Sequence, residues 1–262
     1  MATPELAFTG ERIVPGRTPE ALFSEHEARY VFAGQYVSGK DVLDIACGTG
    51  VGTSFLRRAG ARRVYGLDID PDAIAFAKAR YRDCEFGQSD ATDLGLPSSS
   101  VDVVVSFETL EHVRDQRTFL TECRRVLRPR GMVICSTPNI TVYRWFGTNP
   151  YHVRELTAGE FTSLLAEYFV GLTLFSQSEQ LYPLFVLRSV VMPVRSVVAR
   201  SLDRMRLKRS IKRILRTTVP PQEMRKEFSR EAGIVPRGVQ PYQETWLKRP
   251  VHMVAVGWKG LD

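Results

Sequence analysis

The feature that most constrains this chain is a short apolar run that enters a glycine-rich turn. Val42-Leu43-Asp44-Ile45 is followed by Ala46-Cys47-Gly48-Thr49-Gly50, and residues 51–59 then have helical character. Glycines permit a tight turn and close approach of a ligand to the backbone, while the amide groups at a helix N-terminus favour a charged ligand. The segment therefore predicts a strand, a loop and a helix arranged around a charged small molecule.

Strand and helix patterns alternate along much of the chain. The nearly continuous valine run at residues 101–107 is typical of a strand buried on both faces of a parallel sheet. Further strands are expected at residues 64–67, 84–86, 132–136, 169–175 and 252–258, and helices at 72–80, 118–127 and 157–168. This alternation predicts a doubly wound α/β sheet that binds its ligand at the carboxyl ends of the strands.

The two last expected strands are far apart in the sequence but can pair as a terminal hairpin, which makes the residues between them a long insertion with helical periodicity. A chain of 262 residues is large enough for one well-buried domain with such an insertion. We expect an N-terminal helical lid segment at 1–40, the core at 41–180, a basic helical insertion at 181–249 and the final core strand at 250–262.

The net charge of +7 is concentrated in the expected insertion. Residues 183–230 contain 13 Lys or Arg and 3 Asp or Glu, a local charge of +10 that leaves −3 for the rest of the chain. Such basic helices could contact an anionic membrane or the phosphates of a linked sugar, form a homodimer, or serve as a solvated lid. No recognisable RNA-binding module accompanies the charge, which argues against a nucleic-acid partner.

The spacing of the cysteines and the hydropathy of the chain indicate the cellular compartment of the protein. The four cysteines are widely separated and show no CxxC spacing, so neither a disulfide framework nor a zinc site is expected. The chain starts without the pattern of a signal peptide, and its most apolar stretch is shorter than the ~18 residues of a membrane span. We expect a cytoplasmic protein without a transmembrane helix, peripheral to the inner membrane face if the insertion binds lipid.

The glycine pattern discriminates between two classes of cofactor. A dinucleotide fingerprint needs a third glycine at Thr53, whereas the acidic Asp44, four positions before Gly48, suits a cofactor with an ammonium group. Residues 42–50 resemble motif I of the class I S-adenosylmethionine-dependent methyltransferases, with Ala46 where many members have glycine. The resemblance implies a Rossmann-like seven-stranded sheet and S-adenosyl-L-methionine as cofactor.

Later segments extend this resemblance. Asp68 ends the second expected strand and, by the resemblance, accepts hydrogen bonds from both ribose hydroxyls, as a carboxylate can. Asp90-Ala91 resembles the motif at the adenine edge, and residues 101–131 match the motifs that follow. The resemblance thus implies cofactor contacts from Asp44, Ala46, Cys47, Gly48, Gly50, Asp68, Ile69, Asp90, Ala91 and Phe107.

A candidate metal site follows the valine-rich strand. Glu108, Glu111 and His112 share one face if a helix begins there, and His152 in a later loop is a candidate fourth ligand. Carboxylate and imidazole ligands suit Mg²⁺ or Mn²⁺. The pattern is similar to that of the small-RNA terminal 2′-O-methyltransferases, in which a divalent ion holds two vicinal hydroxyls.

The alternative is a metal-free site, in which Glu111 only caps or pairs locally and His112 lines the pocket. His112 or His152 would then act as a general base. His26 lies between two glutamates, which predicts a solvated helix face for it.

Four segments indicate the class of acceptor. Residues 8–12, 25–30, 106–112 and 149–156 together resemble methyltransferases of bacterial surface-polysaccharide and glycosylated-metabolite pathways. We therefore expect O-methylation of a sugar hydroxyl in a glycan, a glycoside or a nucleotide-linked or lipid-linked sugar. A methyltransferase of a quinone or polyprenyl phenol, a methyltransferase of an RNA ribose and a non-enzymatic binding module remain open alternatives.

Overall fold

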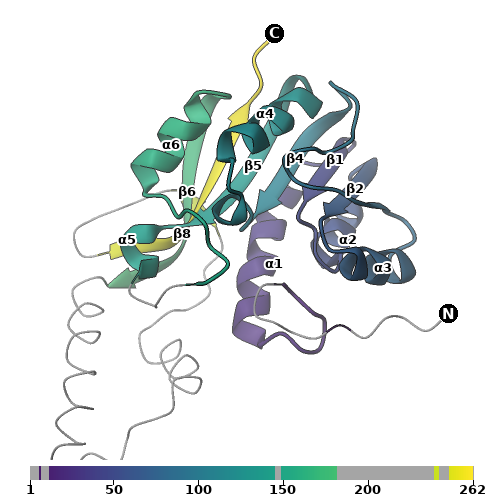
Figure 1. Ribbon diagram of the computed structural model, residues 1–262, viewed down its shortest axis with the longest axis horizontal. Helices are drawn as coiled ribbons and strands as arrows, with labels where there is room; N and C mark the ends of the chain where they lie inside the picture. The colour runs from purple at the N-terminus through teal and green to yellow at the C-terminus, as the bar shows by residue number, and fades with distance from the viewer. Residues whose placement is uncertain (1–5, 7–11, 145–148, 182–238, 242–247, 262) are drawn as a thin grey trace, which may run out of the picture.

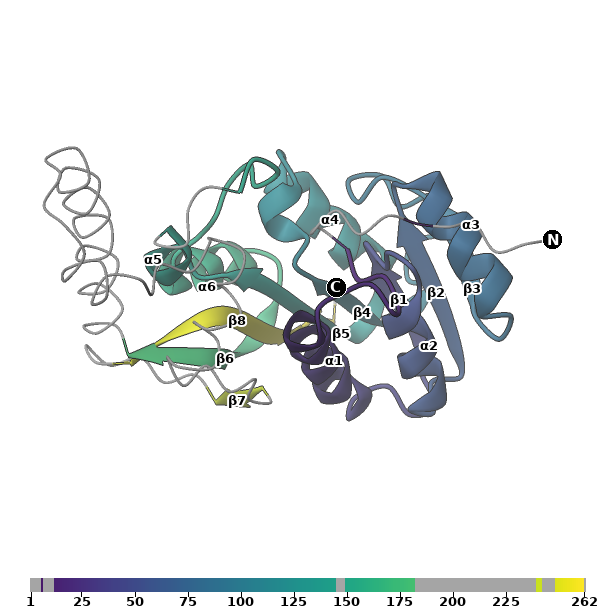
Figure 2. The ribbon, with the colours of Figure 1, turned by 90° about the horizontal axis from the view of Figure 1, so that it is seen from below.

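The structure is a computed structural model of the 262-residue chain, and it describes residues 6, 12–144, 149–181, 239–241 and 248–261. One mixed sheet runs through the described part of the chain, with helices on both faces (Figures 1 and 2). Its strand order is β3-β2-β1-β4-β5-β8-β6-β7. The strands are β1 Asp41–Ile45, β2 Arg63–Asp68, β3 Glu85–Gln88, β4 Val101–Phe107, β5 Leu127–Pro138, β6 Val170–Leu181, β7 Gln240–Pro241 and β8 Lys248–Trp258.

Strands β1 to β5 pair in parallel, and β8 pairs antiparallel with both β5 and β6. The helices are α1 Glu20–Gly34, α2 Val51–Arg58, α3 Pro71–Arg80, α4 Gln116–Val126, α5 Ile140–Tyr143 and α6 Ala158–Ala166, with a 3-10 turn η1 at Leu110–His112. Because parallel strands need crossover connections, these helices return the chain from the carboxyl edge of the sheet to its other edge. The loops at the carboxyl edge are therefore held by buried strands on one side and by helices on the other.

Two apolar layers hold the sheet between its helices. On one face Val103 and Val105 of β4 pack with Leu56 of α2, and on the other Val104 packs with Phe119 of α4; all five side chains are fully buried. Figure 2 shows α1 and α2 below the sheet and α4 above it. Each such side chain contributes about 1.5–3 kcal/mol to folding, so the sheet is a firm support for the loops at its edge.

The structure confirms the predicted α/β sheet and most of its elements, with some differences. The strands expected at 169–175 and 252–258 do pair, but β8 lies inside the sheet and contacts β5 as well as β6. The short β7 adds an eighth strand. The helix expected to begin at Glu108 is only the 3-10 turn η1, because the backbone at Glu108 is left-handed, with φ +52°.

The predicted helices of the insertion fall mostly on residues 182–238, which lie outside the described residues. Among the helices that the structure describes, none has the length and apolar character that a membrane span requires.

Candidate functional site

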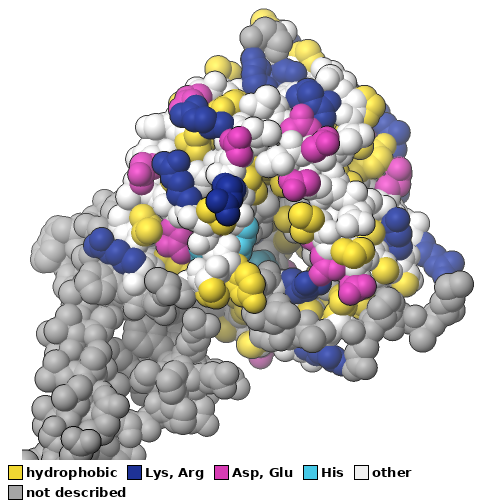
Figure 3. All heavy atoms as spheres, viewed as in Figure 1, with side chains coloured by type: hydrophobic (Ala, Val, Ile, Leu, Met, Phe, Trp, Pro, Cys, Tyr) yellow, Lys and Arg dark blue, Asp and Glu magenta, His cyan; other side chains and the backbone are white. Residues whose placement is uncertain are grey.

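A cavity of about 870 Å³ lies at the carboxyl ends of β1, β2 and β4. Its walls come from the glycine-rich loop, the ends of β2 and β4, the loop after β3 and helix α1. Figure 3 shows a hollow in the middle of this face with histidine side chains in it. A cavity of this size fits a small-molecule ligand, since such sites measure roughly 300–1,000 Å³.

The glycine-rich loop has the backbone that the sequence pattern predicts. Ala46, Gly48 and Gly50 have φ values of +58°, +55° and +77°. A side chain at Gly50 would place its Cβ 2.8 Å from the ring of Phe86 and 2.9 Å from the Cβ of Ala77, so only glycine fits there. The loop then runs into α2, whose first residues, Val51 and Gly52, line the cavity. Ala46 adopts the same backbone region as the glycines at some steric cost.

Asp68 ends β2 at the cavity wall and ties the loop to the sheet. Its Oδ2 accepts a hydrogen bond from the amide of Gly48 at 2.7 Å, and its Oδ1 accepts one from the amide of Asp70 at 2.9 Å. The neighbouring Ile69 is 65% exposed, which leaves an apolar surface at the rim of the cavity. These positions are compatible with the predicted contacts of Asp68 and Ile69 to a nucleoside.

Asp90, Ala91 and Phe107 also line the cavity, as do Ala46, Cys47 and Gly48. Asp90 Oδ1 accepts hydrogen bonds from the amide and the hydroxyl of Thr92, both at 2.7 Å, and these bonds lower the pKa of Asp90. Asp90, which the sequence predicts to contact the adenine, is therefore ionised at neutral pH. A tight local turn holds its carboxylate in place.

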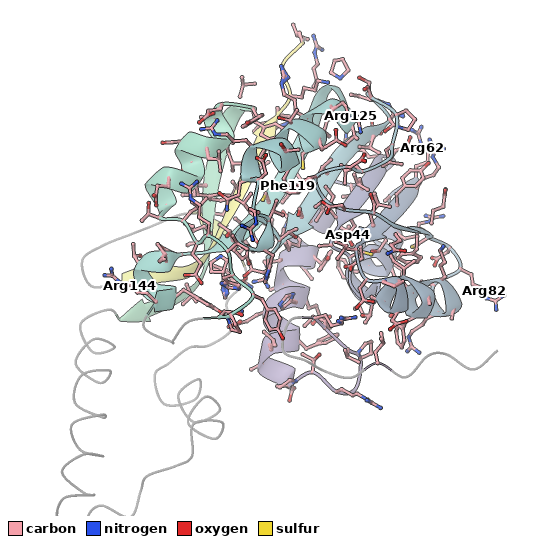
Figure 4. All side chains as sticks on the ribbon, in the orientation of Figure 1. Asp44, Arg62, Arg82, Phe119, Arg125 and Arg144 are labelled. Atoms are coloured by element: carbon pink, nitrogen blue, oxygen red, sulfur yellow. The ribbon has the colours of Figure 1, made fainter. Side chains whose placement is uncertain are left out.

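Asp44 and Gly50, in contrast, do not line the cavity, although both were expected to touch the cofactor. Asp44 is fully buried, and Figure 4 shows it in the interior of the molecule. It accepts hydrogen bonds from the Thr53 hydroxyl at 2.6 Å and the Tyr30 hydroxyl at 3.1 Å. Burial raises the pKa of Asp44 to about 7 even though these hydrogen bonds lower it. Tyr30, which the sequence patterns did not single out, lines the cavity in its place.

The segment before α1 crosses the glycine-rich loop. Arg12 forms an ion pair with Asp70, and the Thr49 hydroxyl donates a hydrogen bond to the carbonyl of Ile13 at 2.8 Å. Arg12 and Ile13 both contribute to the cavity wall. In the described part of residues 1–40, this segment and α1 line the cavity, and the lid role expected for residues 1–40 stays a prediction.

Beside the cavity, ligand atoms of Glu111, His112 and His152 lie within 4.8 Å of one another, and of these three residues His112 lines the cavity wall while Glu111 and His152 do not. The Nδ1 of His112 lies 3.1 Å from the carbonyl of Tyr151, and the Nδ1 of His152 lies 2.5 Å from Glu155 Oε1. Histidines that bind metals usually donate their second ring N–H to such a group, which fixes the ring orientation. The three side chains therefore have the composition and the supports of a small cation site.

Glu111 itself is almost completely buried. Its Oε2 accepts a hydrogen bond from the Thr137 hydroxyl at 3.0 Å, whereas its Oε1 has no hydrogen-bond partner among the described residues. Burial and the neighbouring Glu108 raise the pKa of Glu111. A buried polar atom without a partner is costly, and a bound water or ion is one way to satisfy it.

Backbone hydrogen bonds bring the His152 loop to this point. The amides of Val153 and Arg154 both donate to the carbonyl of Glu111, at 2.8 and 3.2 Å. The ring of Tyr143, in α5, stacks on the His152 ring with centroids 5.3 Å apart. Residues 40 positions apart in the sequence thereby form one site, and the exposed side chains of Tyr151 and Val153 lie on the loop beside it.

Glu108 does not join this group, although it was expected to be a metal ligand. Its left-handed backbone turns the carboxylate toward β5 and β8, where Oε1 accepts a hydrogen bond from the Ser136 hydroxyl at 2.6 Å and Oε2 lies 3.5 Å from His252 Nε2. Burial would raise the pKa of Glu108, but Arg29, His252 and Ser136 hold that pKa at about 2. Glu108 is therefore a separate, ionised carboxylate at the cavity wall.

Helix α1 supplies polar residues that the sequence patterns did not reveal. His26 lines the cavity, contrary to the solvated face expected from its glutamate neighbours, and burial lowers its pKa to about 3. The guanidinium of Arg29, 1% exposed, donates to Gln177 Oε1 at 2.7 Å, and Gln177 donates to the carbonyl of Glu25. These bonds tie α1 to β6, and no local pattern in the sequence signals them.

The strand order, with β8 antiparallel between β5 and β6, and the cavity over a glycine-rich first loop define the fold of the class I S-adenosylmethionine-dependent methyltransferases. Residues 43–135 match the family described as "Methyltransferase domain". This stretch holds the glycine-rich loop, both candidate nucleoside carboxylates and two residues of the candidate cation site.

Related proteins agree with this classification. A probable S-adenosylmethionine-dependent methyltransferase of Mycolicibacterium smegmatis is 43% identical over 164 residues, 61% of this chain and 63% of that protein. The match thus spans about three-fifths of the relative's length. Shorter matches, each 38% identical, include a fatty-acid O-methyltransferase of M. smegmatis over 114 residues and a ubiquinone biosynthesis O-methyltransferase of Cereibacter sphaeroides over 105 residues.

Among solved structures, a putative methyltransferase in complex with the Trm112 methyltransferase activator of Haloferax volcanii has a similar fold. Its TM-score is 0.59 at 19% identity, and 92% of each chain is covered. At that sequence identity the similarity shows only that the two chains share a fold.

Proposed function

We propose that the protein is an S-adenosylmethionine-dependent O-methyltransferase that acts on a sugar hydroxyl, in a glycan, a glycoside or a nucleotide-linked or lipid-linked sugar. The observation that carries the proposal is the convergence of Glu111, His112 and His152 beside a cofactor-sized cavity, which His112 reaches directly. A divalent cation at these residues would hold the acceptor hydroxyl, and Mn²⁺ or Mg²⁺ is the expected ion.

The cavity residues fit the proposed cofactor. S-adenosylmethionine supplies an electrophilic methyl group on a sulfonium, and the wall offers Asp68 and Asp90 for hydroxyl and amine donors. Gly48 leaves room for close approach of a ligand to the loop backbone, since the nearest atom to an added Cβ there is 3.9 Å away. The remaining task of the chain is to hold the acceptor oxygen in line with the methyl carbon, which accounts for several kcal/mol of catalysis in well-oriented reactions.

The cation site fits the chemistry of a hydroxyl acceptor. A hydroxyl has a pKa far above 7, and direct contact with a divalent ion lowers the free energy needed to remove its proton. The buried Glu111 Oε1 has no described partner, and a cation would satisfy it. If the site binds no metal, His112 or His152 is the candidate general base, since each ring is oriented through its Nδ1.

A polyol acceptor is favoured by the position of Glu108. Three protein ligands leave open positions on a six-coordinate ion, enough for two neighbouring hydroxyl oxygens. Glu108 presents a second, ionised carboxylate to the same cavity, and it can accept a hydrogen bond from a further hydroxyl. A sugar supplies all three groups, whereas a single phenol supplies one.

The first experiment is calorimetry of S-adenosylmethionine binding, followed by turnover of a panel of vicinal-diol sugars with and without Mn²⁺ or Mg²⁺. We expect cofactor binding without metal, at least tenfold faster turnover with metal, and loss of that metal effect in Glu111→Gln. The exposed Glu85→Gln is the matched control and should behave as the wild type. Absence of cofactor binding would refute the methyltransferase proposal, while metal-independent turnover would refute only the cation site.

A quinone or polyprenyl phenol is the second candidate acceptor. It is favoured by the similarity of 105 residues to a ubiquinone biosynthesis O-methyltransferase and by the exposed Tyr151 and Val153 on the loop beside the candidate cation site. This acceptor predicts turnover of a polyprenyl phenol that depends on detergent or lipid vesicles. An RNA acceptor would instead show binding that weakens steeply with salt.

A further inference from the structure

The buried carboxylate of Asp44 is separated from the cavity by one side chain, that of Tyr30. Asp44 is fully buried and is not part of the cavity wall, whereas Tyr30 is. The Tyr30 hydroxyl lies 3.1 Å from Asp44 Oδ1 and 3.3 Å from Oδ2. Tyr30 therefore links the cavity wall to Asp44 through a hydrogen bond.

The Tyr30 ring is fixed on two sides. A Cβ added to Gly52 would lie 1.9 Å from its Cζ, so the ring occupies the space that any side chain at position 52 would take. The edge of Phe107 meets the ring at a centroid distance of 5.1 Å and an interplanar angle of 84°. The Thr53 hydroxyl holds Asp44 from the other side at 2.6 Å. The phenolic oxygen is thus held in place before any ligand arrives.

The direction of these hydrogen bonds determines whether the phenol donates a hydrogen bond to a group in the cavity or accepts one from it. Burial raises the pKa of Tyr30, so the phenol keeps its proton, and above pH 7, where Asp44 with its pKa of about 7 is ionised, that carboxylate can only accept. With its proton directed at Asp44, the phenolic oxygen keeps its acceptor capacity for a donor in the cavity. A carboxylate behind a phenol makes that oxygen a better acceptor, and a cationic donor benefits most.

We propose that Tyr30 is a cofactor-binding residue, whose phenolic oxygen accepts a hydrogen bond from the ammonium group of S-adenosylmethionine while Asp44 acts through Tyr30. The inference rests on the proposed function, because it assumes that this cofactor occupies the cavity. It replaces the direct contact between Asp44 and the ammonium group that the sequence pattern predicts. Tyr30 is then a residue of α1 that completes the site built by the glycine-rich loop.

The test compares two ligands that differ in the ammonium-bearing part. S-adenosylhomocysteine retains the amino acid portion, and 5′-methylthioadenosine lacks it. In Tyr30→Phe we expect the affinity for S-adenosylhomocysteine to fall about 10-fold to 100-fold, as for loss of a hydrogen bond to a charged group, and that for 5′-methylthioadenosine to change less than about twofold. Both affinities are measured by calorimetry, and Tyr36→Phe is the matched control on the same segment.

A double-mutant cycle tests the link to Asp44. Asp44→Asn should weaken S-adenosylhomocysteine binding in the wild type but have little further effect in Tyr30→Phe, because the two residues act as one unit. Equal weakening of both ligands in Tyr30→Phe would mean that the ring only shapes the cavity, and no change would also overturn the inference. If the wild type binds neither ligand, the proposed function fails instead.

Discussion

At the scale of the residue, Asp44 couples the proposed cofactor site to the stability of the fold. Its pKa is about 7 in the folded protein, because burial disfavours the charged form, against an ordinary value of 3.8. Between these two values the folded protein holds a proton that the unfolded chain has released. The free energy of unfolding therefore falls as pH rises through this window, by up to about 1.4 kcal/mol per pH unit, and levels off above the folded pKa.

We predict that Asp44→Asn removes this dependence, so that the stability of the variant relative to the wild type rises between pH 5 and 7. Urea denaturation at pH 5, 6, 7 and 8 without ligand measures the difference. His26, whose pKa is lowered to about 3 by burial, has the opposite dependence, but it is present in both proteins and cancels. Parallel pH profiles for the two proteins would contradict the prediction.

At the scale of the element, the packing of α1 on α2 depends on Gly52. Gly52 lies in the first turn of α2, where an added Cβ would lie within 2.3 Å of three ring atoms of Tyr30. We predict that Gly52→Ala lowers the free energy of unfolding by about 2 kcal/mol, a typical value for overpacking. In a Tyr30→Ala background the same substitution should be neutral or stabilising by up to about 1 kcal/mol, since alanine is the better helix former.

Gly159→Ala is the matched control for this experiment. Gly159 occupies the same position in the first turn of α6, and nothing lies within 4 Å of its added Cβ. Urea denaturation of all four variants measures the effect. If Gly52→Ala were as harmless as Gly159→Ala, the packing of Tyr30 on α2 would not be as described.

At the scale of the whole molecule, local patterns in the sequence predict the core but not the contacts between distant segments. The valine run of β4 and the glycine-rich loop are local signals, and both elements are where the sequence predicts them. The pairing of Arg29 with Gln177 joins residues 148 positions apart, and it depends on how α1 docks on β6. The direction of the Glu108 carboxylate depends on one left-handed residue, which its sequence neighbours do not indicate.

The long segment between β6 and β8 is flanked by two paired residues, and this pairing predicts that the segment can be removed. Leu181 and Lys248 are paired residues of neighbouring strands, so the 66 residues 182–247 begin and end at one place in the sheet, and they include the short β7 at its edge. We predict that an Asn-Gly turn in their place, which also removes β7, keeps the other strands of the sheet and cofactor binding. It should raise the free energy of unfolding by about 2 kcal/mol, because a shorter loop loses less entropy on closure. Circular dichroism, urea denaturation and calorimetry check this, with a 66-residue Gly-Ser linker as control; an unfolded short variant would contradict it.

The pairing of Leu181 with Lys248 also bears on how chains with this core diversify. Two paired residues lie on strands about 4.8 Å apart, so an inserted segment of any length starts and finishes within one strand spacing. The hydrogen bonds between β6 and β8 do not depend on the length of that segment. Segments of different length at this point are therefore compatible with the same pairing of β6 and β8.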